Sequence, residues 1–229
     1  MITVKDLWIQ YMELLQKIAP DTYLALSPPI SQELLDETEA LYKSHNLPFP
    51  TELKEIYSIT NGNNNTYACF GVYILTPIEY VFQQDVYSEN SHWYKKDWED
   101  DDPSGFSSLP QDYIKTTYLS KNWIPFSCDG TGGNLYLDLD PDKKGNIGQI
   151  IGWHCDEDTW TVFADSMTDF LMGLIIKLQT GDYQLDEYNE KRLARLTKND
   201  VSTGYFAMAN FGILDEKNDI LGSRKSLKS

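Results

Sequence analysis

The three cysteines and three histidines of this chain are its main candidates for metal chemistry. Cys128, His154 and Cys155 could supply three of the four ligands of a zinc site. Neighbouring residues on a strand point to opposite faces, however, so His154 and Cys155 would face apart, and a fourth ligand is not evident. The cysteines also lack a CxxC spacing. We therefore interpret them as buried thiols in a reducing compartment and expect no bound metal.

Three aspartates at alternate positions could begin a calcium-binding loop. Asp138, Asp140 and Asp142 have the spacing of the first ligands of an EF-hand. The sixth position of such a loop would be Lys143 and the twelfth Gln149, where glycine and a bidentate glutamate are needed. The pattern therefore favours a solvated hairpin turn over a calcium site.

The glycine-rich stretch at 129–134, DGTGGN, could suggest a phosphate-binding loop. It lacks the Walker spacing, no Lys-Ser or Lys-Thr follows it, and the GxGxxG pattern is absent. Glycines are common at turns and bulges that enter a strand. We interpret this stretch as such a turn and expect no nucleotide cofactor.

His154 is followed by three acidic residues, Asp156, Glu157 and Asp158, and a carboxylate can orient an imidazole for acid–base catalysis. Neither a serine nucleophile elbow nor an HExxH motif accompanies this histidine. The absence of such motifs indicates a protein that is not an enzyme. A metal-dependent enzyme that uses His154 and the nearby carboxylates remains an alternative.

The charge of the chain restricts its partners. Its 229 residues include 19 basic and 35 acidic side chains, a formal net charge of −16. Such a charge repels nucleic acid phosphates and anionic membranes, and it attracts basic proteins. The sequence also lacks an apolar run of about 18 residues or a signal peptide at its beginning, so we expect a cytoplasmic protein without a membrane span.

Two acidic segments contain or adjoin large aromatic residues, a combination that suits a protein interface. One lies within a long loop expected at 88–112, and the other is the acidic turn before Trp160. Solvated surface loops would explain the same composition. The predicted partner-binding residues are Trp93, Tyr94, Trp98, Glu99, Asp100, Asp101, Asp102, Asp156, Glu157, Asp158 and Trp160.

Hydrophobic periodicity and capping residues predict the elements that position these segments. Helices are expected over residues 3–18, after a Ser31 cap, from a Thr51 cap, over 77–87 and from 167, with a further helix at 186–198. Strands are expected at 67–77, 134–140, 147–153 and 159–164. The order of helices, strands and a closing helix indicates an α+β fold.

An ordered set of residues from 30 to 171 resembles the SUKH superfamily. The set comprises Ile30, Glu39, Leu47-Pro48, Leu53, Tyr57, Asn61-Gly62, Trp123, Ile124-Pro125, Asp129-Gly130, Asp138, Asp140-Pro141, Gly148-Gln149, Phe163-Ala164 and Phe170-Leu171. This superfamily contains fungal Smi/Knr-type regulators of cell-wall synthesis and many bacterial immunity proteins. The resemblance covers about residues 27–181.

The resemblance implies N-terminal helices, a central mixed or antiparallel sheet and closing C-terminal helices. We expect one SUKH-like domain over residues 1–182 and a helical extension over 183–229 that packs on it. Our first functional hypothesis is an immunity protein that neutralises a basic, nuclease-type toxin by occlusion. The alternative is a cell-wall-synthesis or signalling regulator of the Smi/Knr type. The sequence leaves the oligomeric state open.

Overall fold

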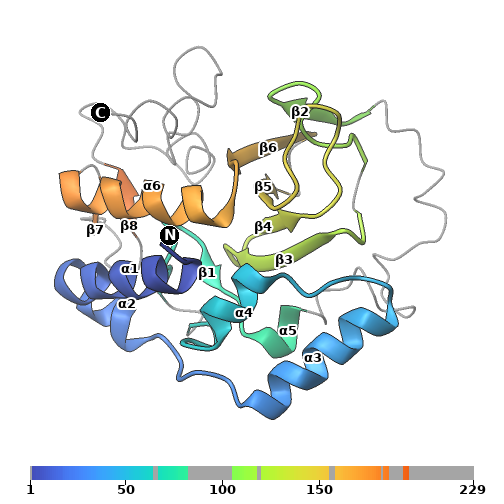
Figure 1. The fold of residues 1–229 in the computed structure, drawn as a ribbon. Coiled ribbons are helices and arrows are strands. Elements are labelled where there is room, and N and C mark those ends of the chain that lie inside the picture. The colour runs from blue at the N-terminus through green and yellow to red at the C-terminus, as the bar shows by residue number, and fades with distance from the viewer. Residues whose placement is uncertain are drawn as a thin grey trace.

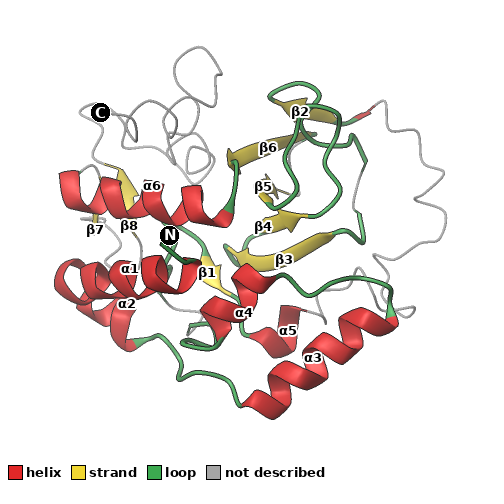
Figure 2. Cartoon of the chain, viewed as in Figure 1, coloured by secondary structure: helices red, strands yellow, loops and turns green. Residues whose placement is uncertain are grey.

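The computed structural model describes residues 2–63, 67–81, 105–117, 120–154, 158–181, 183–185 and 193–195. Figures 1 and 2 show helices on one side of a twisted sheet. The helices are α1 (Val4–Ile18), α2 (Pro20–Leu24), α3 (Gln32–Ser44), α4 (Thr51–Tyr57), α5 (Ile78–Val81) and α6 (Met167–Thr180). The strands are β1 (Ile74–Leu75), β2 (Ser107–Leu109), β3 (Trp123–Cys128), β4 (Gly133–Asp138), β5 (Gln149–His154), β6 (Thr159–Ala164), β7 (Tyr183–Leu185) and β8 (Leu193–Arg195).

Six of these strands form one mixed sheet in the order β1-β3-β4-β5-β6-β2. The neighbouring strands from β1 to β6 in this order are antiparallel, and β2 pairs parallel to β6 at the edge. Strands β7 and β8 form a separate antiparallel pair. The α+β fold and the mixed central sheet that we expected are therefore confirmed.

Local capping residues begin the longer helices. Thr3 accepts a hydrogen bond from the Asp6 amide at 3.0 Å, and Asp6 accepts one from the Thr3 amide at 3.0 Å, which is a capping box. The Ser31 hydroxyl accepts a hydrogen bond from the Leu34 amide at the start of α3, and the Ser166 hydroxyl accepts one from the Asp169 amide at the start of α6. Thr51 is the first residue of α4 rather than its cap, because Pro50 occupies the cap position. These caps explain why the helix beginnings were readable from the sequence.

The two faces of the sheet bury different sets of side chains because strand residues alternate. One face joins α1, α4 and α6 in the larger core through Ile124, Phe126, Leu135, Leu137, Ile150 and Phe163. The other face carries a smaller cluster made of Trp123, Tyr136, Ile151, Trp153, Trp160 and Val162 together with Ile114. No described helix supplies a residue to this second cluster. The segment 105–117, which we call the strap, covers it with Phe106, Tyr113 and Ile114.

Four further expectations differ from the structure, the first being the loop expected over 88–112, in which Ser107–Leu109 forms strand β2. Residues 123–128 form a strand that we had not predicted, because Pro125 argues against a strand interior; the register shifts beside it, between Pro125 and Ser127. The strand expected over 67–77 is limited to Ile74–Leu75, since Phe70 and Tyr73 exchange hydrogen bonds in a tight turn. Leu193–Arg195 is a strand within the stretch where a helix was expected.

Candidate protein-binding corner

Strands β2 and β6, which follow the two predicted acidic segments in the sequence, pair with each other. Ser107 pairs with Thr159 and Leu109 with Thr161 in a parallel ladder. The Ser107 amide donates to the Asp158 carbonyl at 2.8 Å, and the hydroxyls of Ser107 and Thr159 lie 2.8 Å apart. Because parallel strands run in the same direction, both begin at the same end of the sheet. We call the place where β2 and β6 begin the acidic corner.

Asp158 is the predicted partner-binding residue that the structure places on the surface of this corner, where it is exposed. The other acidic residues of the prediction, Glu99 to Asp102 with Asp156 and Glu157, lie outside the described residues, as do Trp93, Tyr94 and Trp98. Along the sequence, Asp102 is five positions before Ser107 and Glu157 directly precedes Asp158. The pairing of β2 with β6 thus fixes one described end of each segment beside the other.

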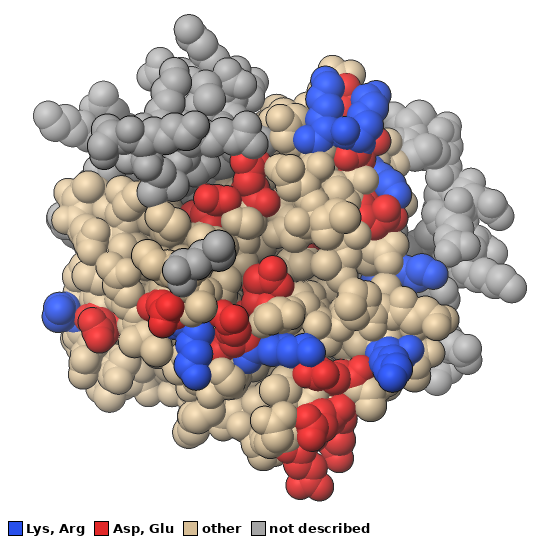
Figure 3. Space-filling view, in the orientation of Figure 1, with Lys and Arg blue, Asp and Glu red and all other residues tan. Residues whose placement is uncertain are grey.

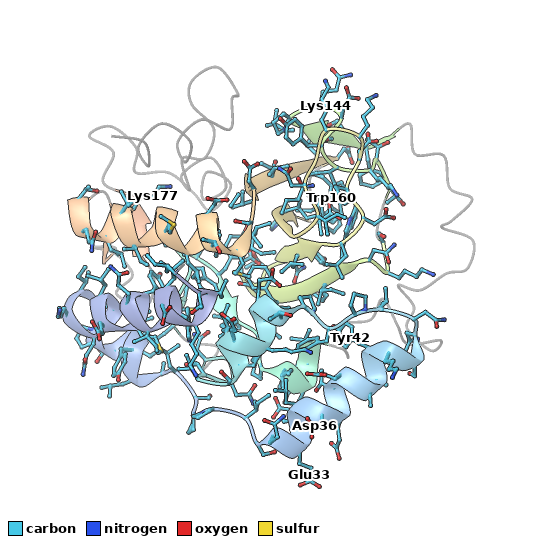
Figure 4. The ribbon with its side chains drawn as sticks, in the orientation of Figure 1. Glu33, Asp36, Tyr42, Lys144, Trp160 and Lys177 are labelled. Carbon is cyan, nitrogen blue, oxygen red and sulfur yellow. The ribbon has the colours of Figure 1, made fainter. Side chains whose placement is uncertain are left out.

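Trp160 was expected to contribute to a binding surface, and the structure instead places it in the interior with 0% of its surface exposed. Its ring centroid lies 4.4 Å from that of Trp123, and it stacks on Trp153 at 5.4 Å. The indole Nε1 donates to the Thr117 carbonyl at 3.0 Å. Figure 4 shows the residue inside the sheet region. Its physical role in this arrangement is to hold the strap against the second cluster.

The strap is also attached at its centre to a buried polar pair. The side chain of Gln149, which is fully buried, donates to the Tyr113 carbonyl at 3.0 Å and to the Asp138 carboxylate at 2.8 Å. Gln149 also accepts a hydrogen bond from the Asn146 amide at 3.1 Å. These contacts connect the strap, β4 and β5 through one amide side chain. The signal in the sequence for this buried pair is that Asp138 and Gln149 are polar residues at strand positions with apolar neighbours.

Asp138 is a carboxylate with 0% exposure. Burial raises its pKa to about 6, although hydrogen bonds from the Asp140 amide and Gln149 act in the opposite direction. The Trp123 indole, whose Nε1 makes no hydrogen bond to a described residue, also lowers this pKa. Asp140 adds a like charge that raises the pKa further. Salt bridges within the described residues do not include Asp138.

The turn between β4 and β5 is bonded to the strap from the other side. Lys143 and Lys144 each pair with one oxygen of Asp112 at 2.9 Å, and these hydrogen bonds lower the pKa of the Asp112 carboxyl. The Lys144 amide donates to the Asp112 carbonyl at 2.9 Å. Figure 3 shows the resulting group of lysine and acidic side chains at the upper right, where Figure 4 labels Lys144. This end of the sheet carries compensated charges.

The glycine-rich turn at 129–134 binds its own carboxylate. Asp129 Oδ1 accepts hydrogen bonds from the amides of Thr131 at 2.7 Å and Gly133 at 2.9 Å. A Cβ on Gly133 would lie under 3.0 Å from this carboxylate, which explains the glycine. The amides of Thr131 and Gly133 are therefore already used within the turn, and the interpretation as a structural turn fits this geometry.

The candidate calcium ligands have separate surroundings. Asp140 pairs with Lys115 and accepts from Asn122, while Asp142 accepts from the Lys143 amide and Asp138 is buried. Across the described ranges, no group of three His, Cys, Asp or Glu side chains is arranged to hold a metal ion. Burial raises the pKa of the Cys69 thiol, which disfavours the reactive thiolate. Cys155 lies outside the described residues.

The fold and the corner define the class of this protein: an α+β domain with helices on one face of a mixed sheet and a non-helical strap on the other. Residues 29–173 match the model of the SMI1 / KNR4 family (SUKH-1), which covers more than half of the chain. The chain therefore belongs to this family, and the resemblance inferred from its residues is confirmed.

Several curated fungal proteins are similar to parts of the chain. A glucan synthesis regulatory protein of Neurospora crassa is 34% identical over 121 residues, which cover 52% of this chain and 23% of that protein. KNR4/SMI1 homolog 2 of Debaryomyces hansenii is 35% identical over 83 residues, covering 36% and 14%. The cell wall assembly regulator SMI1 of Saccharomyces cerevisiae is 31% identical over 83 residues, covering 36% and 16%. The chain thus matches less than a quarter of the length of each of these relatives.

No helix among the described residues is long and apolar enough to cross a membrane.

Proposed function

We propose that this chain is a non-catalytic protein-binding module that acts in the regulation of cell-wall or glucan synthesis. The observation that carries the proposal is the set of matched relatives, which are named as regulators of glucan synthesis and of cell-wall assembly in different fungi. Family membership over residues 29–173 supports a shared domain type. This proposal adopts the alternative of our sequence hypotheses.

We place the partner contact at the acidic corner. Asp158 is exposed there, and the hydrogen bond between Ser107 and Asp158 anchors β2 beside it. The acidic residues 99–102 and 156–157 adjoin these two strands in the sequence. A net charge of −16 favours a basic partner and speeds its approach. Trp160 is left out of this contact surface because its ring is buried.

Toxin neutralisation remains the competing hypothesis, and the acidic charge is the observation in its favour. The names of the matched relatives support a regulator better. The identity of the bound protein separates the two functions. A basic nuclease whose toxicity is suppressed by co-expression of this chain would establish immunity, whereas a protein of wall or glucan synthesis would establish regulation.

The experiment compares three full-length baits in extracts of the organism that carries the gene. The first is the natural chain, and the second, the corner variant, has Glu99→Gln, Asp100→Asn, Asp101→Asn and Asp102→Asn in the acidic segment that precedes β2 in the sequence. The third has the same loss of four charges elsewhere, by Asp21→Asn, Glu33→Gln, Asp36→Asn and Glu37→Gln at exposed positions of α2 and α3. Figure 4 labels Glu33 and Asp36 at the far end of the molecule from Trp160.

We expect the natural chain and the α2–α3 variant to retain the same basic partner and the corner variant to lose it. Association rates measured with the purified partner should fall in the corner variant and become less dependent on salt. Equal losses in both variants would mean that net charge alone drives binding. Binding that survives in the corner variant and fails in the α2–α3 variant would place the interface on the helices instead.

A further inference from the structure

The strap encloses a carboxylate that has no cationic partner among the described residues. Asp138 ends β4 with 0% exposure, and the atoms that reach it are the Gln149 amide at 2.8 Å and the Asp140 amide at 2.9 Å. The Gln149 side chain also donates to the Tyr113 carbonyl, and it thereby links Asp138 to the strap. Burying an ionised carboxylate without a countercharge is costly, because hydrogen bonds replace only part of its hydration.

The charged groups around this site pair with one another rather than with Asp138. From the strap, Lys115 pairs with Asp140 and Asp112 pairs with two lysines of the β4–β5 turn. In the same turn Asp142 accepts from the Lys143 amide. The other titratable residues of β3, β4, β5 and the strap are Cys128, Tyr136, His154 and Tyr113, and Lys121 lies two positions before β3. Asp138 therefore faces a like charge at Asp140 and neutral donors.

Further hydrogen bonds hold the strap in place near this carboxylate. Beyond Gln149, the Asp142 amide donates to the Tyr113 carbonyl at 3.2 Å and the Lys144 amide donates to the Asp112 carbonyl at 2.9 Å. Within the strap, Ser108 Oγ accepts from the Ile114 amide at 3.0 Å and donates to the Pro110 carbonyl at 2.6 Å. Unfolding the strap away from the β4–β5 turn would break these contacts, including the bonds of Ser108 within the strap, and bring water to Asp138.

We propose that the strap is a latch controlled by Asp138: it stays closed over the neutral carboxyl and opens more often when Asp138 loses its proton. The direction follows from linkage, because opening hydrates the charge and so the open form binds protons more weakly than the closed form. The latch concerns the fold of this chain and does not depend on the proposed partner. Its opening would loosen the pairing of β2 with β6 and with it the acidic corner.

The size of the effect follows from the two protonation equilibria. With a pKa of about 6 in the closed form and an ordinary aspartate value in the open form, the opening equilibrium increases by about tenfold between pH 5 and pH 8. Most of this increase falls between pH 5 and pH 7. The range lies above the sequence pI of about 4.4, where solubility would be lowest.

The test is hydrogen exchange of the full chain from pH 5 to pH 8, with each rate corrected for the intrinsic pH dependence of amide exchange. The reporting amides are those of Ile114, Asp142 and Lys144, and the Phe170 amide at the start of α6 is the reference. We expect the opening constants of the three reporters to rise about tenfold in the natural protein and to exceed that of Phe170 at every pH, because the strap opens without unfolding the whole domain. In Asp138→Asn the three opening constants should not depend on pH.

Two further measurements keep the proposal open to refutation if Asp138→Asn fails to fold. In the natural protein, the side-chain carbon of Asp138 should titrate over the same pH range in which the reporters change. Ser108→Ala should raise opening at every pH, because it removes two strap hydrogen bonds, and it should keep the pH slope. Reporters with no pH slope, or with opening constants equal to that of Phe170 at every pH, would overturn the latch, since the first excludes coupling and the second indicates exchange through global unfolding.

Discussion

Gly152→Ala is the substitution that most directly tests the packing of the central strands. A Cβ at this position of β5 would lie under 3.0 Å from Phe163 Cε2, 3.0 Å from Leu135 Cδ2 and 3.1 Å from Phe163 Cδ2. Phe163 is 1% exposed and packs edge-to-face on Tyr73, with ring centroids 6.3 Å apart. The phenyl ring therefore has little room to move away from an added methyl group.

The expected cost follows from two opposing effects. Forcing an extra carbon into a packed core destabilises by about 1–3 kcal/mol, and the smaller entropy of an unfolded alanine returns about 0.4–1 kcal/mol. We expect a net loss of roughly 1–2 kcal/mol, which corresponds to a decrease in Tm of about 2–8 °C for a chain of this size. Urea unfolding followed by tryptophan fluorescence and thermal unfolding followed by circular dichroism would measure both quantities.

Gly173→Ala is the matched control. Gly173 lies in the interior of α6, and a Cβ there would meet nothing within 4 Å. The same change should stabilise the protein by about 0.5–1 kcal/mol, since glycine is less favourable than alanine in a helix. In Gly152→Ala, adding Phe163→Leu should recover part of the loss, giving a coupling energy of about 0.5–3 kcal/mol between the two sites. A Gly152→Ala protein at least as stable as Gly173→Ala would refute this account of the sheet packing.

Three other outcomes are expected. Tyr57→Phe should lower the free energy of unfolding by about 1 kcal/mol, because its buried hydroxyl donates to the Thr76 carbonyl at 2.7 Å, and an unchanged urea midpoint would contradict this bond. For Asp138, the raised folded pKa of about 6 favours the protonated folded state, so its contribution to stability is present at low pH and is lost as pH rises through 6. The stability of Asp138→Asn relative to the natural protein should therefore increase by about 1.4 kcal/mol from pH 5 to pH 8 in urea titrations, and a flat or opposite trend would contradict the burial of a charge there. Added zinc, calcium or a chelator should leave Tm unchanged, whereas a concentration-dependent increase would support the metal-dependent alternative at His154.

The elements that we predicted correctly are those whose signals lie within a few residues. The Thr3, Ser31 and Ser166 caps are local hydrogen bonds, so the sequence reveals where α1, α3 and α6 begin. Alternating apolar residues indicate β4, and the two apolar runs that follow it indicate β5 and β6, for the same reason. Strand β2 has no comparable signal, because it is three residues long and exists through pairing with β6.

The candidate site was only partly readable from the sequence. Acidic and aromatic composition pointed to the segments around the corner, but composition does not state which aromatic rings face solvent. Trp160 shares a cluster with Trp123 and Trp153 because three strands place these rings on one face and the strap covers them. In the comparison with a calcium loop, Gln149 stands at the position where a glutamate ligand is needed. In the structure its side chain instead binds the Tyr113 carbonyl, which is 36 positions away in the sequence.

The sequence by itself determined the family, the helix caps, the apolar periods of the main strands and the acidic charge, since each depends on residue types and short spacings. Tertiary structure alone decided that Ser107 lies beside Thr159, 52 positions later, and that Asp138 is enclosed by the strap. Local patterns specify what a segment can form, whereas burial and pairing depend on which distant segment covers it. The acidic corner and the latch both arise from that second kind of information.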